Sequence, residues 1–300
     1  MPLSKDYFNK NTNTLKLLSK ETIDDLVNIF RSEKHKIILK KIPLILNIHP
    51  KEYILYYLKG LSHAKLGNFS NAILDLKIAL KLNPNNHEIY NHIGLCYYHT
   101  DNLKKAKFYY QSGLKLKNDN FNLITNLANL LKEENSFDQA LTLYIKSLTL
   151  ENINKWGIYY NIGLIYLAKK NISKAIENFE ISIKINPYYL KTYLELGNVY
   201  QISGKDLLAQ SFYKQAILLD KNCANAYHRL ADNQKKLNQL DQALINYEIA
   251  TNLNPHSDYL LGYSTFIKMK LCLWEDIENS KSELITGINA GKKVSTPFMI

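Results

Sequence analysis

An alanine recurs six times at nearly equal spacing, and this repetition limits the architecture of the chain more than any other feature. The six positions are Ala72, Ala106, Ala140, Ala175, Ala209 and Ala243. Each lies 34 residues after the last, apart from one extra residue near Lys155. Because a unit of this length cannot enclose a core alone, neighbouring units are expected to stack and bury a continuous one.

Aligning the alanines divides residues 53–257 into six units, which begin at residues 53, 87, 121, 156, 190 and 224. At three other positions of the unit, the side chains are of similar size in all six units. The fourth residue is large: Tyr56, Tyr90, Ile124, Tyr159, Tyr193 and Tyr227. The eighth is small: Gly60, Gly94, Ala128, Gly163, Gly197 and Ala231. The twenty-fourth is aromatic or leucine: Leu76, Tyr110, Tyr144, Phe179, Tyr213 and Tyr247.

This pattern of sizes predicts two antiparallel helices in each unit. Small residues at positions eight and twenty let the helices approach closely, while the large residues fill the flanking space. Turn-forming residues fall between the two expected helices, namely Gly67, Asp101, Asn135, Asn171 and Gly204. A proline, which cannot continue a helix interior, closes three units: Pro84, Pro187 and Pro255.

The period and the conserved sizes resemble the tetratricopeptide repeat. The resemblance implies an all-α solenoid, a right-handed superhelix of antiparallel helix pairs. Residues 19–52 are predicted to be a degenerate first repeat closed by Pro50, although Pro43 lies in its second helix. Residues 1–18 are expected to be a loosely ordered N-terminus, and residues 258–300 to form capping helices and a junction to a further domain.

Composition argues against several classes of protein. Hydrophobic residues make up 46% of the chain and charged residues 22%, as expected of a folded protein. No apolar run approaches the roughly 20 residues that span a bilayer, and the polar start has no signal region, so we predict a cytoplasmic protein without a membrane partner. The net charge is +11, but lysines are spread along the chain and the basic stretch 34–41 lacks aromatics. No nucleic-acid partner is predicted.

The first helix of each unit is predicted to line a concave groove that holds a protein or extended peptide. With positions four, seven, eight and eleven assigned to the core, the candidate groove residues are Asn91, Tyr98, Asn122, Asn126, Asn129, Tyr160, Asn161, Asn198, Gln201, Asn225, Arg229 and Asp232. An asparagine amide both donates and accepts, so a row of them could bond a peptide backbone of any sequence. The alternative is that an asparagine-rich chain scatters this residue over solvated surfaces. The oligomeric state is not indicated.

Two other site chemistries are not favoured by the residues. Lys191, Asn198 and Arg229 resemble part of the set that clamps a C-terminal carboxylate in tetratricopeptide adaptors, but Glu195 would repel that carboxylate. His92, Cys96 and His99 share a helical face at a spacing compatible with zinc, yet Cys96 lies where packing against a neighbouring helix is expected. We predict no metal, no cofactor and no catalytic residue.

The tail after Pro255 carries Cys272, Trp274, Asp276 and the segment 295–298, Ser-Thr-Pro-Phe. It resembles the junction in bacterial and plant proteins similar to the protein O-linked N-acetylglucosamine transferases, including Spindly-like proteins. That resemblance implies repeats that receive protein substrates and a glycosyltransferase domain after Ile300, and the apolar ending is expected of a fragment. Two hypotheses follow: the substrate-recognition region of such an enzyme, or a stand-alone adaptor that assembles protein complexes.

Overall fold

The computed structural model of the chain describes residues 18–150, 155–255, 259–274, 277–291 and 293. The expected loosely ordered start, apart from Leu18, and the tail residues Asp276 and 295–298 lie outside these ranges. The chain divides into two compact units, Met1–Glu151 and Asn152–Ile300, called unit 1 and unit 2 below and described separately.

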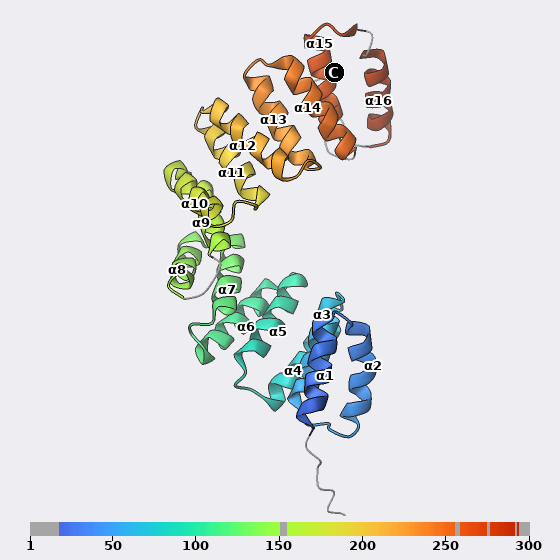
Figure 1. Cartoon of the computed structure of the whole chain (residues 1–300), viewed down its shortest axis with the longest axis vertical. Coiled ribbons are helices and arrows are strands. Elements are labelled where there is room, and N and C mark those ends of the chain that lie inside the picture. The colour runs from blue at the N-terminus through green and yellow to red at the C-terminus, as the bar shows by residue number, and fades with distance from the viewer. Residues whose placement is uncertain (1–17, 151–154, 256–258, 275–276, 292, 294–300) are drawn as a thin grey trace, which may run out of the picture. The chain divides into compact units, whose positions relative to one another are not determined.

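Regular structure in the described residues is helical throughout, and consecutive helices form antiparallel hairpins (Figure 1). The all-α prediction is therefore confirmed. Unit 1 contains α1 (Lys20–Arg31), α2 (His35–Leu46), α3 (Tyr53–Lys65), α4 (Phe69–Leu82), α5 (His87–His99), α6 (Leu103–Leu116), α7 (Phe121–Glu133) and α8 (Phe137–Leu148). Unit 2 contains α9 (Trp156–Ala168), α10 (Ile172–Ile185), α11 (Leu190–Ile202), α12 (Asp206–Leu219), α13 (Ala224–Lys236), α14 (Leu240–Leu253), α15 (Leu260–Lys270) and α16 (Ile277–Asn289).

The core of each hairpin is a contact between the small eighth residue and the large twenty-fourth residue. All six recurring alanines are 0% exposed. A Cβ atom added to Gly163 would lie 2.6 Å from Phe179 Cε1, and one added to Gly60 would lie 2.7 Å from Leu76 Cγ. Real Cβ atoms do not approach so closely, so the large side chain occupies the space that a larger eighth residue would need.

The ends of the helices follow the predicted turn chemistry. Gly67, Asp101, Asn135 and Gly204 adopt positive φ, the left-handed conformation that commonly ends a helix. In the α9–α10 hairpin, which corresponds to the fourth repeat, Lys170 adopts this left-handed conformation, with a φ of 59°. Asn171 caps the next helix instead, since its side chain accepts a hydrogen bond from Lys174 N.

The large fourth residue packs against the hairpin core, as Tyr193 and Tyr227 show, and in two hairpins it also forms a hydrogen bond. Ile124 is 0% exposed, but the tyrosines at this position are only half-buried. Tyr56 donates its hydroxyl to Pro50 O at 3.2 Å, and Tyr193 donates to Pro187 O at 3.0 Å. Each of these tyrosines therefore ties its hairpin to the proline that closes the preceding one.

Replacing Ala140 with leucine should lower the free energy of unfolding by about 1–3 kcal/mol, because the extra carbons have no space in the α7–α8 contact. Ala140 is 0% exposed and belongs to α8. Urea denaturation of the variant and the parent would measure the difference. Ala64, which is partly exposed on α3, provides a control site for the same substitution. Equal stability of the Ala140→Leu variant and the parent would contradict close packing at position twenty.

Candidate functional site: the inner helix faces

The first helices of successive hairpins lie side by side and form what we call the inner face of each unit. In unit 1 this face contains α3, α5 and α7. The rings of Tyr57 on α3 and His92 on α5 are 5.7 Å apart. Asn126 on α7 donates its Nδ2 to Asn91 Oδ1 on α5 at 2.8 Å. The inner face of unit 2 contains α9, α11 and α13.

An apolar pocket of about 400 Å³ opens on the inner face of unit 1. Its lining comes from α1, α3, α5 and the start of α4: Phe30, Leu61, Ala64, Lys65, Phe69, His92, Leu95, Cys96 and His99. Leu61 and Leu95 occupy position nine, where Asn129 stands in the third hairpin. Neither leucine was among the predicted groove residues, which were chosen for their polarity, although both align with Asn129 at position nine. A pocket with this lining suits an apolar side chain.

A polar row lies beside the pocket on α5 and α7. Asn91 is only 3% exposed, and its carbonyl oxygen accepts the hydrogen bond from Asn126. That bond uses one of the two Asn126 amide hydrogens. Tyr98 on α5 donates its hydroxyl to Glu133 on α7, and burial together with this carboxylate raises the pKa of Tyr98 to about 12. Asn122 is exposed at the start of α7.

Tyrosine hydroxyls from the second helices reach the inner face, which the sequence analysis did not foresee. Tyr144 donates to Asn129 Oδ1 at 2.5 Å, Tyr213 donates to Gln201 Oε1 at 2.9 Å, and Tyr247 donates to Asp232 Oδ1 at 2.5 Å. The Tyr213 ring lies against Gly197, the small eighth residue of α11, and its hydroxyl reaches the inner face beyond that contact. These bonds fix the orientation of three predicted groove residues.

The amino acids at position twenty-four agree with this geometry. Phe179 and Leu76 have no hydroxyl at this position. In their hairpins, positions nine and twelve of the first helix hold only apolar residues: Leu164 and Leu167 with Phe179, and Leu61 and Ala64 with Leu76. A polar inner-face residue thus accompanies a tyrosine in the α7–α8, α11–α12 and α13–α14 hairpins, where the hydrogen bonds are observed.

Replacing Tyr213 with phenylalanine should cost about 1 kcal/mol of stability, because Gln201 loses its donor while the ring contact remains. Thermal unfolding monitored by circular dichroism would measure the change. Tyr188→Phe, at a side chain that is 81% exposed, is the matched control. A difference below about 0.3 kcal/mol between the two variants would mean that the hydroxyl adds no stability.

The inner face of unit 2 combines aromatic, amide and charged side chains. Tyr160 on α9 packs edge-on against Tyr189, with ring centroids 5.2 Å apart, and burial and Glu195 raise its pKa to about 12. Asn161 donates its Nδ2 to Gly157 O at 3.0 Å, and Asn198 is half-buried on α11. The exposed Asn225 accepts a hydrogen bond from Arg229 Nε at 3.3 Å.

Asp232 is the centre of a charged cluster at the C-terminal end of this face. Lys235 Nζ lies 3.1 Å from its Oδ1, and His228 Nε2 lies 3.3 Å from its Oδ2. Burial lowers the pKa of His228, which opposes the effect of the nearby carboxylate. Lys235 Nζ also lies 4.5 Å from the ring centroid of Tyr263. Asp232 is therefore already paired within the protein.

The two alternative chemistries have the following geometry. His92, Cys96 and His99 line one pocket, but Cys96 is 2% exposed and burial raises its thiol pKa to about 11. A thiol so hard to ionise is a poor metal ligand and packs as a small apolar residue. Within the described residues, no cluster of three potential metal ligands occurs.

Glu195 lies near Tyr160 and contributes to its raised pKa, so a negative charge is present where a carboxylate clamp would need a neutral amide.

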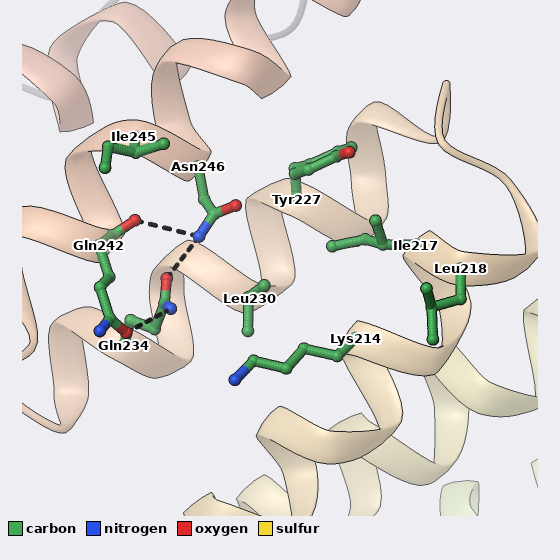
Figure 2. Close-up of a pocket in the computed structure, with 9 residues that line it drawn as sticks. All are labelled: Lys214, Ile217, Leu218, Tyr227, Leu230, Gln234, Gln242, Ile245 and Asn246. Carbon is green, nitrogen blue, oxygen red and sulfur yellow. Dashed lines mark hydrogen bonds between the residues drawn. The ribbon is translucent and has the colours of Figure 1, made fainter.

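A second groove lies on the opposite, outer side of unit 2, between α12 and α14 (Figure 2). Its volume is about 610 Å³. Leu218 and Ile245, 67% and 57% exposed, line its two sides. Along α13 and α14 three amides form a hydrogen-bonded chain: Asn246 Nδ2 donates to Gln234 Oε1 at 2.7 Å, and Gln234 Nε2 donates to Gln242 Oε1 at 3.1 Å. None of its lining residues was among the predicted site residues.

Among the described helices, none is both long and apolar enough to cross a membrane.

Tetratricopeptide repeat models match residues 157–189, 87–120, 190–223 and 224–257, and a model described as TPR repeat matches residues 60–101. Together these matches cover residues 60–120 and 157–257, more than half of the chain. Their 34-residue ranges coincide with the second, fifth and sixth units of the sequence alignment.

The curated relatives resemble parts of this chain. Heat shock protein STI1 of Saccharomyces cerevisiae is 31% identical over 84 residues, 28% of this chain and 14% of that protein. Human Protein O-mannosyl-transferase TMTC1 is 26% identical over 116 residues, 38% of this chain and 13% of that protein. The chain thus spans about an eighth to a seventh of these relatives. The solved structure of PilW, a type IV pilus biogenesis factor, has a TM-score of 0.64 at 16% identity and covers 69% of this chain and 96% of that one, a likeness in fold alone.

Proposed function

Because the chain belongs to the tetratricopeptide repeat family, we propose that it is a scaffold that binds an extended protein segment on the inner faces of its hairpins. The observation that carries this proposal is the apolar pocket of unit 1 beside the amides of α5 and α7. The pocket takes one apolar side chain of the ligand. The Asn126 and Asn129 amides bond its backbone. We propose a cytoplasmic location and no catalytic role for this chain.

Filling the pocket should abolish recognition of the apolar side chain. Ala64 is half-buried in the pocket lining, and tryptophan at this position would occupy the volume that the ligand needs. Peptides selected from a random display library on the parent chain should bind the Ala64→Trp variant at least about tenfold more weakly. The lost contact is the burial of one apolar side chain, worth about 1.5–3 kcal/mol.

Ser173→Trp, at an exposed position of the outer helix α10, is the control for a surface tryptophan and should leave affinity unchanged. Titration calorimetry with a selected peptide would compare both variants with the parent. If the selected peptides bind Ala64→Trp as tightly as the parent, the ligand does not use this pocket, and the proposed site is incorrect.

Two biological settings fit this scaffold. In the first, the repeats deliver protein substrates to a glycosyltransferase of the O-linked N-acetylglucosamine transferase type. It is supported by the resemblance of the Cys272 and Trp274 region and, more loosely, by the similarity to TMTC1. In the second, an adaptor assembles protein complexes, and the similarity to STI1 supports it equally. Reading the genome beyond the codon for Ile300 separates them, since only the first predicts a glycosyltransferase in the same open reading frame.

A further inference from the structure

The outer helices α4 and α6 of unit 1 differ in charge from the outer helices of unit 2. Together α4 and α6 contain six lysines and one acid, Asp75. Asp75 is 6% exposed and pairs with Lys59 of α3 at 2.9 Å, so it does not offset charge at the surface. In contrast, α10 contains two lysines and two glutamates, and α12 contains one lysine and one aspartate. The helices α4 and α6 therefore carry more positive charge than α10 and α12.

Two of these lysines converge on one aromatic ring. Lys77 Nζ on α4 and Lys105 Nζ on α6 lie 5.6 Å and 5.3 Å from the ring centroid of Tyr97 on α5. Tyr109 on α6 stacks on the same ring at 5.5 Å. Among the described residues, neither lysine forms an ion pair with a carboxylate, although Lys107 pairs with Glu134. Two like charges held near one ring favour an anion between them.

Exposed apolar side chains flank these two cations on both helices. Leu74 and Ile78 on α4 are 63% and 41% exposed, and Phe108 and Leu116 on α6 are 62% and 44% exposed. The two helices thus present exposed apolar side chains together with the two cations. The complement of such a face is a surface that carries both carboxylates and apolar groups.

We propose that this face, centred on Lys77 and Lys105, docks an acidic amphipathic helix of a partner protein. A helix is the element that carries a lengthwise row of carboxylates beside apolar residues, through its i, i+3 and i+4 neighbours. Its carboxylates pair with the two lysines, and its apolar residues cover Leu74 and Phe108. Nucleic acid fits less well, because three of the four exposed apolar side chains named above, Leu74, Ile78 and Leu116, offer no aromatic face on which a base can stack.

The test uses the full chain and a labelled synthetic helix of glutamate and leucine, about five turns long, with a matched peptide in which glutamine replaces glutamate. Fluorescence anisotropy should show binding of the glutamate peptide that weakens as salt is raised. The Lys77→Gln/Lys105→Gln variant should bind about tenfold more weakly, and so should Phe108→Ser. Lys184→Gln/Lys214→Gln, with two exposed lysines on α10 and α12 replaced, should bind as the parent does.

Several results would overturn the proposal: no binding of the glutamate peptide, equal affinity for the glutamine peptide, or equal loss in the control variant. Vesicles of phosphatidylserine and phosphatidylcholine, and a DNA duplex, are tested in parallel. Binding of either that depends on Lys77 and Lys105, without binding of the peptide, would assign the face to that partner instead. The Ala64→Trp variant should keep full affinity for the glutamate peptide, which separates this surface from the inner-face pocket.

Discussion

Replacing Phe179 with alanine is expected to lower the free energy of opening of the α9–α10 hairpin by about 3–5 kcal/mol. Phe179 is 0% exposed and lies against Gly163 of α9. Truncation removes the largest side chain from this contact. Gly163 has no side chain that could move into the space, so the variant carries both the lost burial and an unfilled cavity.

Hydrogen exchange of the α9 and α10 amides is the appropriate measurement, because a repeat array can open one hairpin without unfolding completely. The opening free energy of these amides should fall by the stated amount, while the amides of α3 and α4 in unit 1 should not change. Tyr188→Ala, at a side chain that is 81% exposed and close in sequence, should change it by less than about 0.5 kcal/mol. A decrease below about 1 kcal/mol in Phe179→Ala would show that position twenty-four is not central to the hairpin.

The hairpin core could be predicted from the sequence because its determinant is side-chain size, and size is visible in an alignment. Six alanines at one position admit few explanations other than close contact between helices, and all six are fully buried. The turns were also predictable, since Gly67 and Gly204 mark positive φ directly. Lys170 shows the limit: position in the hairpin imposes the left-handed conformation even on a residue that does not favour it.

The candidate site was less predictable, because its polar atoms pair across elements that the periodicity treats separately. From the sequence, Asn129 and Gln201 are expected to have no hydrogen-bond partner within the protein. In the structure they accept hydrogen bonds from the hydroxyl groups of Tyr144 and Tyr213. Asn91 occupies a position assigned to the groove, yet the close approach of α7 covers it. The convergence of Lys77 and Lys105 likewise joins residues 28 positions apart, and only the packing of α4, α5 and α6 brings them to one ring.

A second substitution tests the same contact from the other helix: Gly163→Val should destabilise the α9–α10 hairpin by about 3 kcal/mol, the upper end of the usual cost of overpacking. A Cβ at this position would lie 2.6, 2.7 and 3.0 Å from three atoms of the Phe179 ring, and that ring is fully buried. Valine also helps the helix by roughly 0.5 kcal/mol relative to glycine, so the observed loss would understate the steric cost.

The decisive measurement is the double variant Gly163→Val/Phe179→Ala, followed by hydrogen exchange of the same amides. Once the ring is absent, the valine side chain has room and fills part of the cavity, so adding it should stabilise the Phe179→Ala protein. The two changes should therefore cost less together than the sum of their separate effects, by about 3 kcal/mol, as expected of residues in direct contact. Additive effects would mean that each substitution acts on its own helix, and the small eighth residue would then have some purpose other than accommodating the large one.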